Sequence, residues 1–382
     1  MKKEITRRDW LNRSSLLLGS SFLGASVGIN TLKAAVNRPI SNEPVRMMFN
    51  ENPYGPSQVA RRAMRKAFNE SNLYSMRGAK AEFKELMAKL NGVTPDHIAV
   101  GFGSGEILKK AALMNGIDKG ELLSPSLTFE TINRYAKTMQ SNVKRIPMTK
   151  NIGIDLDKMS EKISSKTKMV YLCNPNNPTG LLMDTNDLKL FCKQISQKAI
   201  VFVDEAYHEF SGAPSATSLV PSTHNLCVLR TFSKAWGLAG ARLGYVIAAP
   251  EVIDQLKKIK SLLDINLLAI KAAILLIAKH DVVTSYISEV KMARTFLATE
   301  LKSHGIQYIS SFANFIHIRL PSQSDPTVIA DLLEEKGYRI RTAGGTATIL
   351  DGCIRITVGT RVQMFDFTKH LISALNYSSQ SA

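Results

Sequence analysis

The sequence of 382 residues is short of cysteine, tryptophan and acidic side chains, and it has no long uninterrupted apolar run. Four cysteines in a chain of this length exclude a disulfide-rich scaffold. No apolar stretch approaches the ~20 residues of a membrane-spanning helix, which excludes a multi-pass membrane protein. The remaining composition, 45% hydrophobic and 21% charged, excludes disordered, collagen-like and coiled-coil proteins. The length suggests two or three core-forming units.

The shortage of acidic residues leaves a net charge of +17. A positive charge of this size makes nucleic acid or an anionic surface a candidate partner. Residues 1–38 hold seven basic and two acidic residues, a net charge of +5, and the other +12 is scattered in pairs such as Arg61-Arg62 and Lys257-Lys258. No long basic run alternates with aromatic residues. We therefore expect a solvated basic surface and no nucleic-acid partner.

Residues 1–38 have the three-part pattern of an export signal. A basic start precedes an apolar stretch with small residues over 14–29, and Lys33-Ala34-Ala35 resembles a weak cleavage site. The run Thr6-Arg7-Arg8-Asp9-Trp10-Leu11 resembles a twin-arginine signal, which predicts export to the periplasm by the twin-arginine machinery. The alternatives are a basic, disordered N-terminus or a start site placed too early, and an unused signal would leave the protein in the cytoplasm.

The middle of the chain alternates buried strands with amphipathic helices. Residues 169–173 and 199–203 are short, apolar throughout and followed by polar loops, as in strands of a parallel sheet covered on both faces. Residues 226–229 and 244–248 are further strand candidates, and 185–194 has the pattern of a helix. This alternation predicts an α/β fold with a doubly wound, mostly parallel sheet.

The pattern changes after about residue 250. A long helical stretch is predicted from residue 267 to about 304, followed by strands at 315–318 and 353–358 and a helix near 328–336. These elements predict a second, smaller α+β domain. In such architectures the loops at the carboxyl ends of the sheet strands form the site.

Four motifs fall in such loops. Asp204-Glu205-Ala206-Tyr207 ends one strand, residues 231–242 follow the next, and residues 174–180 close a third. The glycine-rich run 101–106 directly precedes a predicted helix over 107–114, so its free N–H groups can hold an anion. An anion site, a lysine amine, a carboxylate and an amide together suit an aldehyde cofactor with a phosphate and a pyridine ring. The lysine would form a Schiff base, and the carboxylate would keep the ring nitrogen protonated.

The ordered motifs resemble the class I/II, fold-type I pyridoxal-phosphate-dependent aminotransferases, and among them the histidinol-phosphate aminotransferase branch. The resemblance covers about residues 45–375. It is carried by Asn-Pro-Thr-Gly at 177–180, Asp-x-x-Tyr at 204–207, Ser-Lys at 233–234 with an arginine eight residues later, Arg-Ile-Thr-Val-Gly at 355–359 and the N-terminal signature at 50–56. It implies an N-terminal arm (39–70) joining the small domain, a large cofactor-binding domain (71–255) and a small C-terminal domain (256–382).

The resemblance also implies a role for each matching residue. In the catalytic set, Lys234 carries the cofactor and moves the proton, Asp204 pairs with the pyridine nitrogen, and Tyr207 binds the phenolic oxygen. The other cofactor contacts are implied for Asn177 on that oxygen, Phe129 on the ring, and Ser104, Gly105, Thr231, Ser233, Arg242 and a neighbouring subunit's Tyr74 on the phosphate. The implied substrate contacts are Arg355 on the α-carboxylate, with Asn52, Tyr54 and Arg341 around it. No metal is expected.

The implied reaction is ping-pong transamination between an amino acid, or an amino-alcohol phosphate, and a 2-oxo acid, in a homodimer. The branch's usual Tyr-Pro-Asp is Tyr74-Ser75-Met76 here, and His208 stands where an aliphatic residue is usual. A histidinol-phosphate-like or aromatic substrate therefore stays open. The alternatives are another reaction of the same cofactor (decarboxylase, lyase or oxidase) and, more remotely, a non-catalytic regulator that binds the cofactor. We expect the four cysteines to be buried as small apolar residues.

Overall fold

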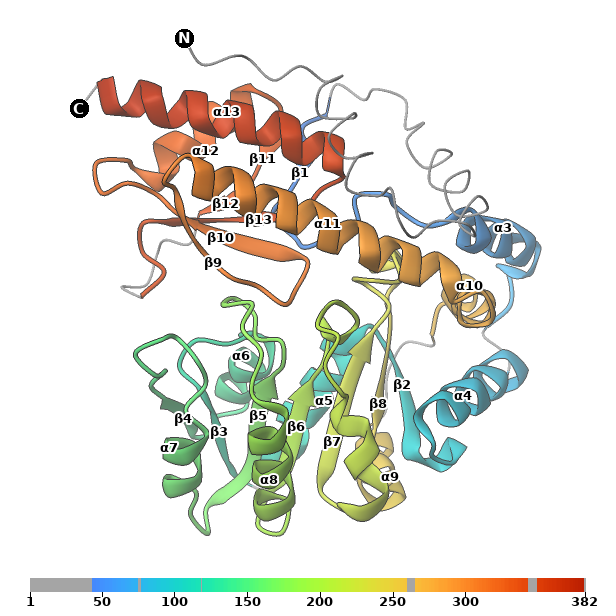
Figure 1. Ribbon diagram of the computed structural model, residues 1–382. Coiled ribbons are helices and arrows are strands. Elements are labelled where there is room, and N and C mark those ends of the chain that lie inside the picture. Colours follow the sequence, from blue (N-terminus) through green and yellow to red (C-terminus); the bar gives the residue numbers. More distant parts are fainter. Residues whose placement is uncertain (1–42, 75–76, 118, 260–264, 343–348, 381–382) are drawn as a thin grey trace. The chain divides into compact units, whose positions relative to one another are not determined.

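The computed structural model describes residues 43–74, 77–117, 119–259, 265–342 and 349–380 (Figure 1). The predicted export signal at residues 1–38 lies outside these ranges. Within them, no helix combines the length and the apolar character that crossing a bilayer requires.

A seven-stranded sheet, in the order β2-β8-β7-β6-β5-β3-β4, carries the four motifs (Figure 1). Only β8 runs against its neighbours, so the sheet is mostly parallel, and the predicted α/β class is confirmed. The strands are β2 (Ile98–Phe102), β3 (Glu121–Pro125), β4 (Val143–Ile146), β5 (Thr167–Cys173), β6 (Ile200–Asp204), β7 (Leu226–Thr231) and β8 (Leu243–Ile247).

Alternate residues of these strands enter two different cores, because successive side chains of a strand point to opposite faces. Tyr171 and Phe202 pack in one cluster with α5 (Ser104–Ile117), α6 (Thr131–Thr138) and α9 (Pro250–Lys258). Leu172 and Val203 pack in the other, with the helices α3 (Gln58–Ala67), α4 (Arg77–Asn91), α7 (Leu156–Glu161), α8 (Thr185–Ile195) and α10 (Leu267–Ala278). Helices on both faces bury the sheet and leave the carboxyl ends of its strands for the site.

A four-stranded antiparallel sheet, in the order β12-β13-β10-β9, forms with its helices a third core. Its strands are β9 (Gln307–Ile309), β10 (Phe315–Arg319), β12 (Arg341–Thr342) and β13 (Cys353–Thr357), and its helices are α11 (Asp281–Ser303), α12 (Pro326–Glu335) and α13 (Arg361–Gln380). Beside it, β1 (Val45–Arg46) pairs in parallel with β11 (Tyr338–Arg339). Short 3₁₀ turns complete the described elements: η1 (Phe68–Glu70), η2 (Pro95–His97), η3 (His208–Phe210), η4 (Ala216–Ser222) and η5 (Ala239–Ala241).

The segment after β1 contributes to two cores. Met47 lies in the cluster of the small sheet, whereas Ala60 and Ala63 of α3 lie in a cluster of the large sheet. The helix α10 also packs with the large sheet, although it follows residue 256. The predicted boundaries at 70 and 255 stay a prediction.

The long helical stretch predicted from residue 267 to about 304 is helical, and it is divided into α10 and α11 with Lys279 and His280 between them. The helix α10 is apolar on most sides and enters a core of the large sheet, and α11 packs on the small sheet. The break lets the two helices serve different cores. The predicted helix over 107–114 is longer than expected, since α5 begins at Ser104. The four cysteines are free and buried, as expected.

Candidate active site

The predicted motifs meet where β5, β6 and β7 end. Asp204 is the last residue of β6 and is paired in register with Cys173, the last residue of β5. Asn177 lies in the loop after β5, and Lys234 lies three residues after the end of β7. Neighbouring parallel strands thus bring a carboxylate, an amide and an amine to one edge of the sheet.

Asp204 is a buried carboxylate held by two donors. The residue is 2% exposed; its Oδ2 accepts a hydrogen bond from the hydroxyl of Tyr171 at 2.8 Å, and its Oδ1 accepts one from the Ala206 N–H at 3.1 Å. Burial, which disfavours the charged form, raises the pKa of Asp204 to about 6 against the opposing effect of these bonds. A cation placed beside this carboxylate would therefore be bound strongly.

A chain of hydrogen bonds joins the large sheet to the small one. The Tyr207 hydroxyl accepts from Asn50 Nδ2 at 2.9 Å and from Asn177 Nδ2 at 3.2 Å. Asn177 Oδ1 in turn accepts from Arg355 Nη1 at 3.0 Å, and the Met48 carbonyl accepts from Arg355 Nη2 at 2.9 Å. The structure therefore brings three of the predicted site residues, Tyr207, Asn177 and Arg355, into direct contact.

Lys234 projects its amine into the same region. Its Nζ donates to the carbonyl of Phe49 at 2.7 Å and lies 5.8 Å from the ring centre of Tyr207. Burial, and then the positive charge of Arg355, lowers the pKa of Lys234 to about 8. With this pKa, roughly a tenth to a fifth of the amine is neutral near physiological pH, far more than for an ordinary lysine, and the neutral form is the one that a nucleophile or a base requires.

The loop at the start of α5 forms a tight cradle, with Arg242 and Gly244 packed against its backbone. Gly103 has φ +77°, and a Cβ there would lie 2.5 Å from Nη2 of Arg242, so the guanidinium closely approaches the backbone. A Cβ on Gly244 would collide with the backbone nitrogen of Ser104. The hydroxyl of Thr231 donates to Ser233 Oγ at 3.0 Å beside it. Free N–H groups of a 14-residue helix, hydroxyls and a guanidinium suit a phosphate.

His317, Arg355 and Arg341 form a row across three strands of the small sheet. The Cα partners of Arg355 are His317 on β10 and Arg341 on β12, and the Arg355 guanidinium lies 5.3 Å from the ring centre of Phe315. His317 is 1% exposed, and burial lowers its pKa to about 3. Phe315 packs edge-on against Tyr207 at 5.2 Å, which fixes the row beside the Lys234 site.

The other predicted residues lie around this centre. Asn52 Oδ1 accepts from the Tyr54 N–H at 2.9 Å, in a turn packed against the glycine three residues after Lys234. The ring of Tyr54 meets that of Tyr286 at 5.7 Å. Phe129 follows β3 and is 37% exposed, and Gly105 lies in the first turn of α5. Tyr74 is 87% exposed on this chain.

Asn50 and Tyr171 are site residues that sequence reasoning missed. Asn50 has φ +56°, donates to Tyr207, and its carbonyl accepts from Asn314 Nδ2 at 3.1 Å. A sequence signal for Asn50 existed, because asparagine is one of the few residue types that tolerate a left-handed backbone. Tyr171 gave no signal, since a tyrosine within an apolar strand is indistinguishable from a core residue.

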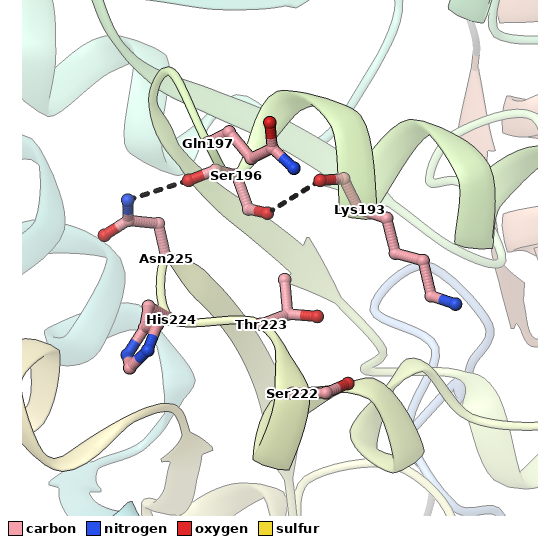
Figure 2. Close-up of a pocket in the computed structure, with 7 residues that line it drawn as sticks. All are labelled: Lys193, Ser196, Gln197, Ser222, Thr223, His224 and Asn225. Carbon is pink, nitrogen blue, oxygen red and sulfur yellow. Dashed lines mark hydrogen bonds between the residues drawn. The ribbon is translucent and has the colours of Figure 1, made fainter.

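A separate hollow of about 540 Å³ lies near the amino ends of β6 and β7, at the opposite end of these strands from Asp204. Figure 2 shows that its polar groups bond one another: Asn225 Nδ2 donates to the Ser196 carbonyl at 2.7 Å, and Ser196 Oγ donates to the Lys193 carbonyl at 3.3 Å. It contains none of the predicted site residues.

The fold and the site together define an enzyme of the pyridoxal-phosphate type, with a lysine, a buried aspartate and a phosphate cradle at the ends of a mostly parallel sheet. Residues 43–371 match the family model Aminotransferase class I and II. The chain is 35% identical over 331 residues to histidinol-phosphate aminotransferase 2 of Carboxydothermus hydrogenoformans, covering 85% of this chain and 90% of the relative. It is 32% identical over 286 residues to an aromatic amino acid aminotransferase of Cutibacterium acnes, covering 74% and 80%.

Two solved structures share the fold. Histidinol-phosphate aminotransferase from Sinorhizobium meliloti, in complex with pyridoxal-5'-phosphate, has a TM-score of 0.80 at 24% identity, covering 94% of this chain and 99% of that one. L-threonine-O-3-phosphate decarboxylase from Porphyromonas gingivalis has a TM-score of 0.76 at 21% identity, covering 87% and 99%. The chain belongs to the aminotransferase class I and II family. It is an aminotransferase, and pyridoxal phosphate is its cofactor.

Proposed function

We propose that Lys234, Asp204 and Tyr207 are the catalytic residues of a ping-pong transamination. The observation that carries this assignment is their convergence: a partly neutral amine and a buried carboxylate lie at one sheet edge, beside a cradle shaped for a phosphate. The residues present fit the polar groups of the cofactor. The residues that would hold its phosphate lie at the α5 N-terminus and beside it: Ser104, Gly105, Thr231, Ser233 and Arg242.

When bound, the cofactor supplies an aldehyde that takes up the amino group and a protonated ring that withdraws electrons. Asp204 holds the proton on the ring nitrogen, because a buried carboxylate is stabilised strongly by an adjacent cation. Tyr207 and Asn177 would donate hydrogen bonds to the phenolic oxygen of the bound cofactor, and their bonds to Asn50 and Arg355 fix their positions. Phe129 would cover one face of the ring of the bound cofactor.

Lys234 is the covalent anchor and the proton carrier. With its lowered pKa, Nζ would accept the α-proton of a bound substrate and later give a proton back. Arg355 binds the α-carboxylate with two parallel hydrogen bonds and so keeps the α-carbon within reach of Nζ. Asn52 and Tyr54 close the site from the N-terminal segment.

The substrates we propose are an amino acid or an amino-alcohol phosphate as donor and a 2-oxo acid as acceptor. The two guanidinium groups of Arg355 and its cross-strand partner Arg341 favour substrates with an acidic group. The relatives named for histidinol phosphate and for aromatic amino acids indicate a donor with a ring, which the aromatic pair Tyr54 and Tyr286 suits.

We further propose a homodimer in which Tyr74 reaches the cofactor phosphate of the partner subunit, which the exposure of this tyrosine supports. We also propose export by the twin-arginine machinery, on the strength of Arg7-Arg8 and the apolar run after them. Replacing both arginines with lysine should retain the protein in the cytoplasm of an expressing cell, and unchanged export would refute this.

The assignment of Lys234 is tested by borohydride reduction and peptide mapping of the purified, cofactor-loaded protein. We expect the reduced cofactor on Lys234 and, in a separate assay, transfer of the amino group from an amino-acid panel to 2-oxoglutarate. A label on another lysine would refute the assignment. Release of carbon dioxide without amino-group transfer would establish the decarboxylase alternative instead. Lys234→Ala should lose turnover, while Lys193→Ala, on the remote α8, should keep it.

A further inference from the structure

Tyr171 is a buried tyrosine directly beneath the catalytic carboxylate. It lies on β5, is 0% exposed, and shares its sheet face with Phe202 and Cys227 in an apolar cluster. On packing grounds phenylalanine would fill this place equally well. The hydroxyl donates to Asp204 Oδ2 at 2.8 Å. Because burying a phenol without a partner costs free energy, the hydroxyl and the carboxylate are matched to each other.

The register of the two strands produces this contact. Cys173 of β5 pairs with Asp204 of β6, so Tyr171, two residues earlier, points to the same face of the sheet and reaches the carboxylate from below. The Ala206 N–H holds the other oxygen, Oδ1. With one donor on each oxygen, the plane of the carboxylate is fixed, and each oxygen keeps a lone pair for a further partner.

We propose that Tyr171 is a positioning residue of the transamination, which orients the Asp204 carboxylate and keeps it ionised for the cofactor's ring nitrogen. This inference rests on the proposed function of Asp204. The Tyr171 hydrogen bond opposes the rise that burial imposes on the pKa of Asp204. Without the hydroxyl, the carboxylate would be protonated at higher pH and would turn more freely.

Other titratable groups also act on Asp204. Glu205 is its neighbour on the chain and raises its pKa, whereas Lys234, from the loop after β7, lowers it. Cys173 on β5 and Tyr207 also interact with its charge. A Tyr171→Phe variant leaves all four in place and removes a single oxygen atom, so a change in pH dependence is attributable to the hydroxyl.

The test compares the cofactor-loaded wild type with Tyr171→Phe. We expect kcat to fall roughly tenfold to hundredfold, the range of a hydrogen bond to a charged group, while KM for the amino donor stays within about twofold. The acidic limb of the kcat/KM profile should move to higher pH, because the variant carboxylate accepts a proton more readily. Tyr338→Phe is the control: its ring packs in the core of the small sheet, its hydroxyl donates to Oδ2 of the half-exposed Asp366 at 2.6 Å, and the loss of this hydroxyl should move neither quantity.

A second replacement guards against misfolding of the first. Incorporating 3-fluorotyrosine at position 171 keeps the ring and makes the hydroxyl a stronger donor, so the acidic limb should move to lower pH. Unchanged kcat and an unchanged limb in either loaded variant would overturn the inference. A wild type that neither binds the cofactor nor transfers an amino group would instead refute the proposed function, so the two failures are distinguishable.

Discussion

Gly103 offers the sharpest test of the phosphate cradle, because the consequence of one added methyl group can be worked out in advance. Gly103→Ala places a Cβ 2.5 Å from Nη2 and 3.0 Å from Cζ of Arg242. The side chain of Arg242 must move, which breaks the hydrogen bond from its Nη1 to the Ala239 carbonyl at 2.9 Å. In addition, alanine is disfavoured at the φ of +77° that glycine adopts here.

The two effects add to a moderate loss of stability and a larger loss of cofactor affinity. The left-handed backbone costs roughly 1–2 kcal/mol and the broken hydrogen bond about 1 kcal/mol. We therefore expect the free energy of unfolding of the cofactor-free protein to fall by about 2–3 kcal/mol. Moving a guanidinium away from a phosphate forfeits a charge-assisted hydrogen bond, so the Kd of pyridoxal phosphate should rise roughly tenfold to hundredfold.

The matched control is Gly78→Ala, in the first turn of α4, which has no proposed role in the site. A Cβ on Gly78 meets no atom within 4 Å, and the backbone there is helical. It should leave the cofactor Kd unchanged and stabilise the protein slightly. Urea unfolding and a spectrophotometric titration measure both quantities. Wild-type affinity in Gly103→Ala, or an equal loss in both variants, would refute the cradle.

The remaining predictions concern charge. Acylation of Lys234 in the cofactor-free protein, followed by peptide mass spectrometry, should reach half its limiting rate at a pH of about 8, because the neutral amine reacts and burial lowers its pKa; a midpoint near the 10.5 of an ordinary lysine would contradict this. Arg355→Lys should lower kcat/KM by roughly 100-fold with a smaller change in kcat, since lysine lacks the fork; a purely kcat effect would argue against carboxylate binding. Arg230→Met should cost roughly 3–5 kcal/mol in urea unfolding, because Glu205, 1% exposed and 2.9 Å away, would be left buried without its cation, and adding Glu205→Leu should restore most of the loss.

The chemistry of this protein was largely determined by the order of short motifs. Apolar runs identified β5, β6 and β7, and each was followed by polar residues, so the amino-acid sequence was sufficient to place Asp204, Lys234 and Asn177 at strand ends. This works because a parallel sheet buried on both faces imposes a strong, local pattern on its strands. The residue types suited an aldehyde cofactor with a phosphate and a pyridine ring, and the resemblance carried by the order of the motifs identified it as pyridoxal phosphate.

Tertiary structure decided what depends on pairing between distant segments. The reversed direction of β8 appears only in its pairing with β2 and β7, and the break between α10 and α11 separates helices that enter different cores, so no local pattern encodes either feature. The contact of Asn50 with Tyr207 joins residues 157 positions apart, and that of Tyr171 with Asp204 depends on strand register. The sequence thus named the reacting groups, whereas their orientation and their shifted pKa values arise from burial and from neighbours that only the folded chain assembles.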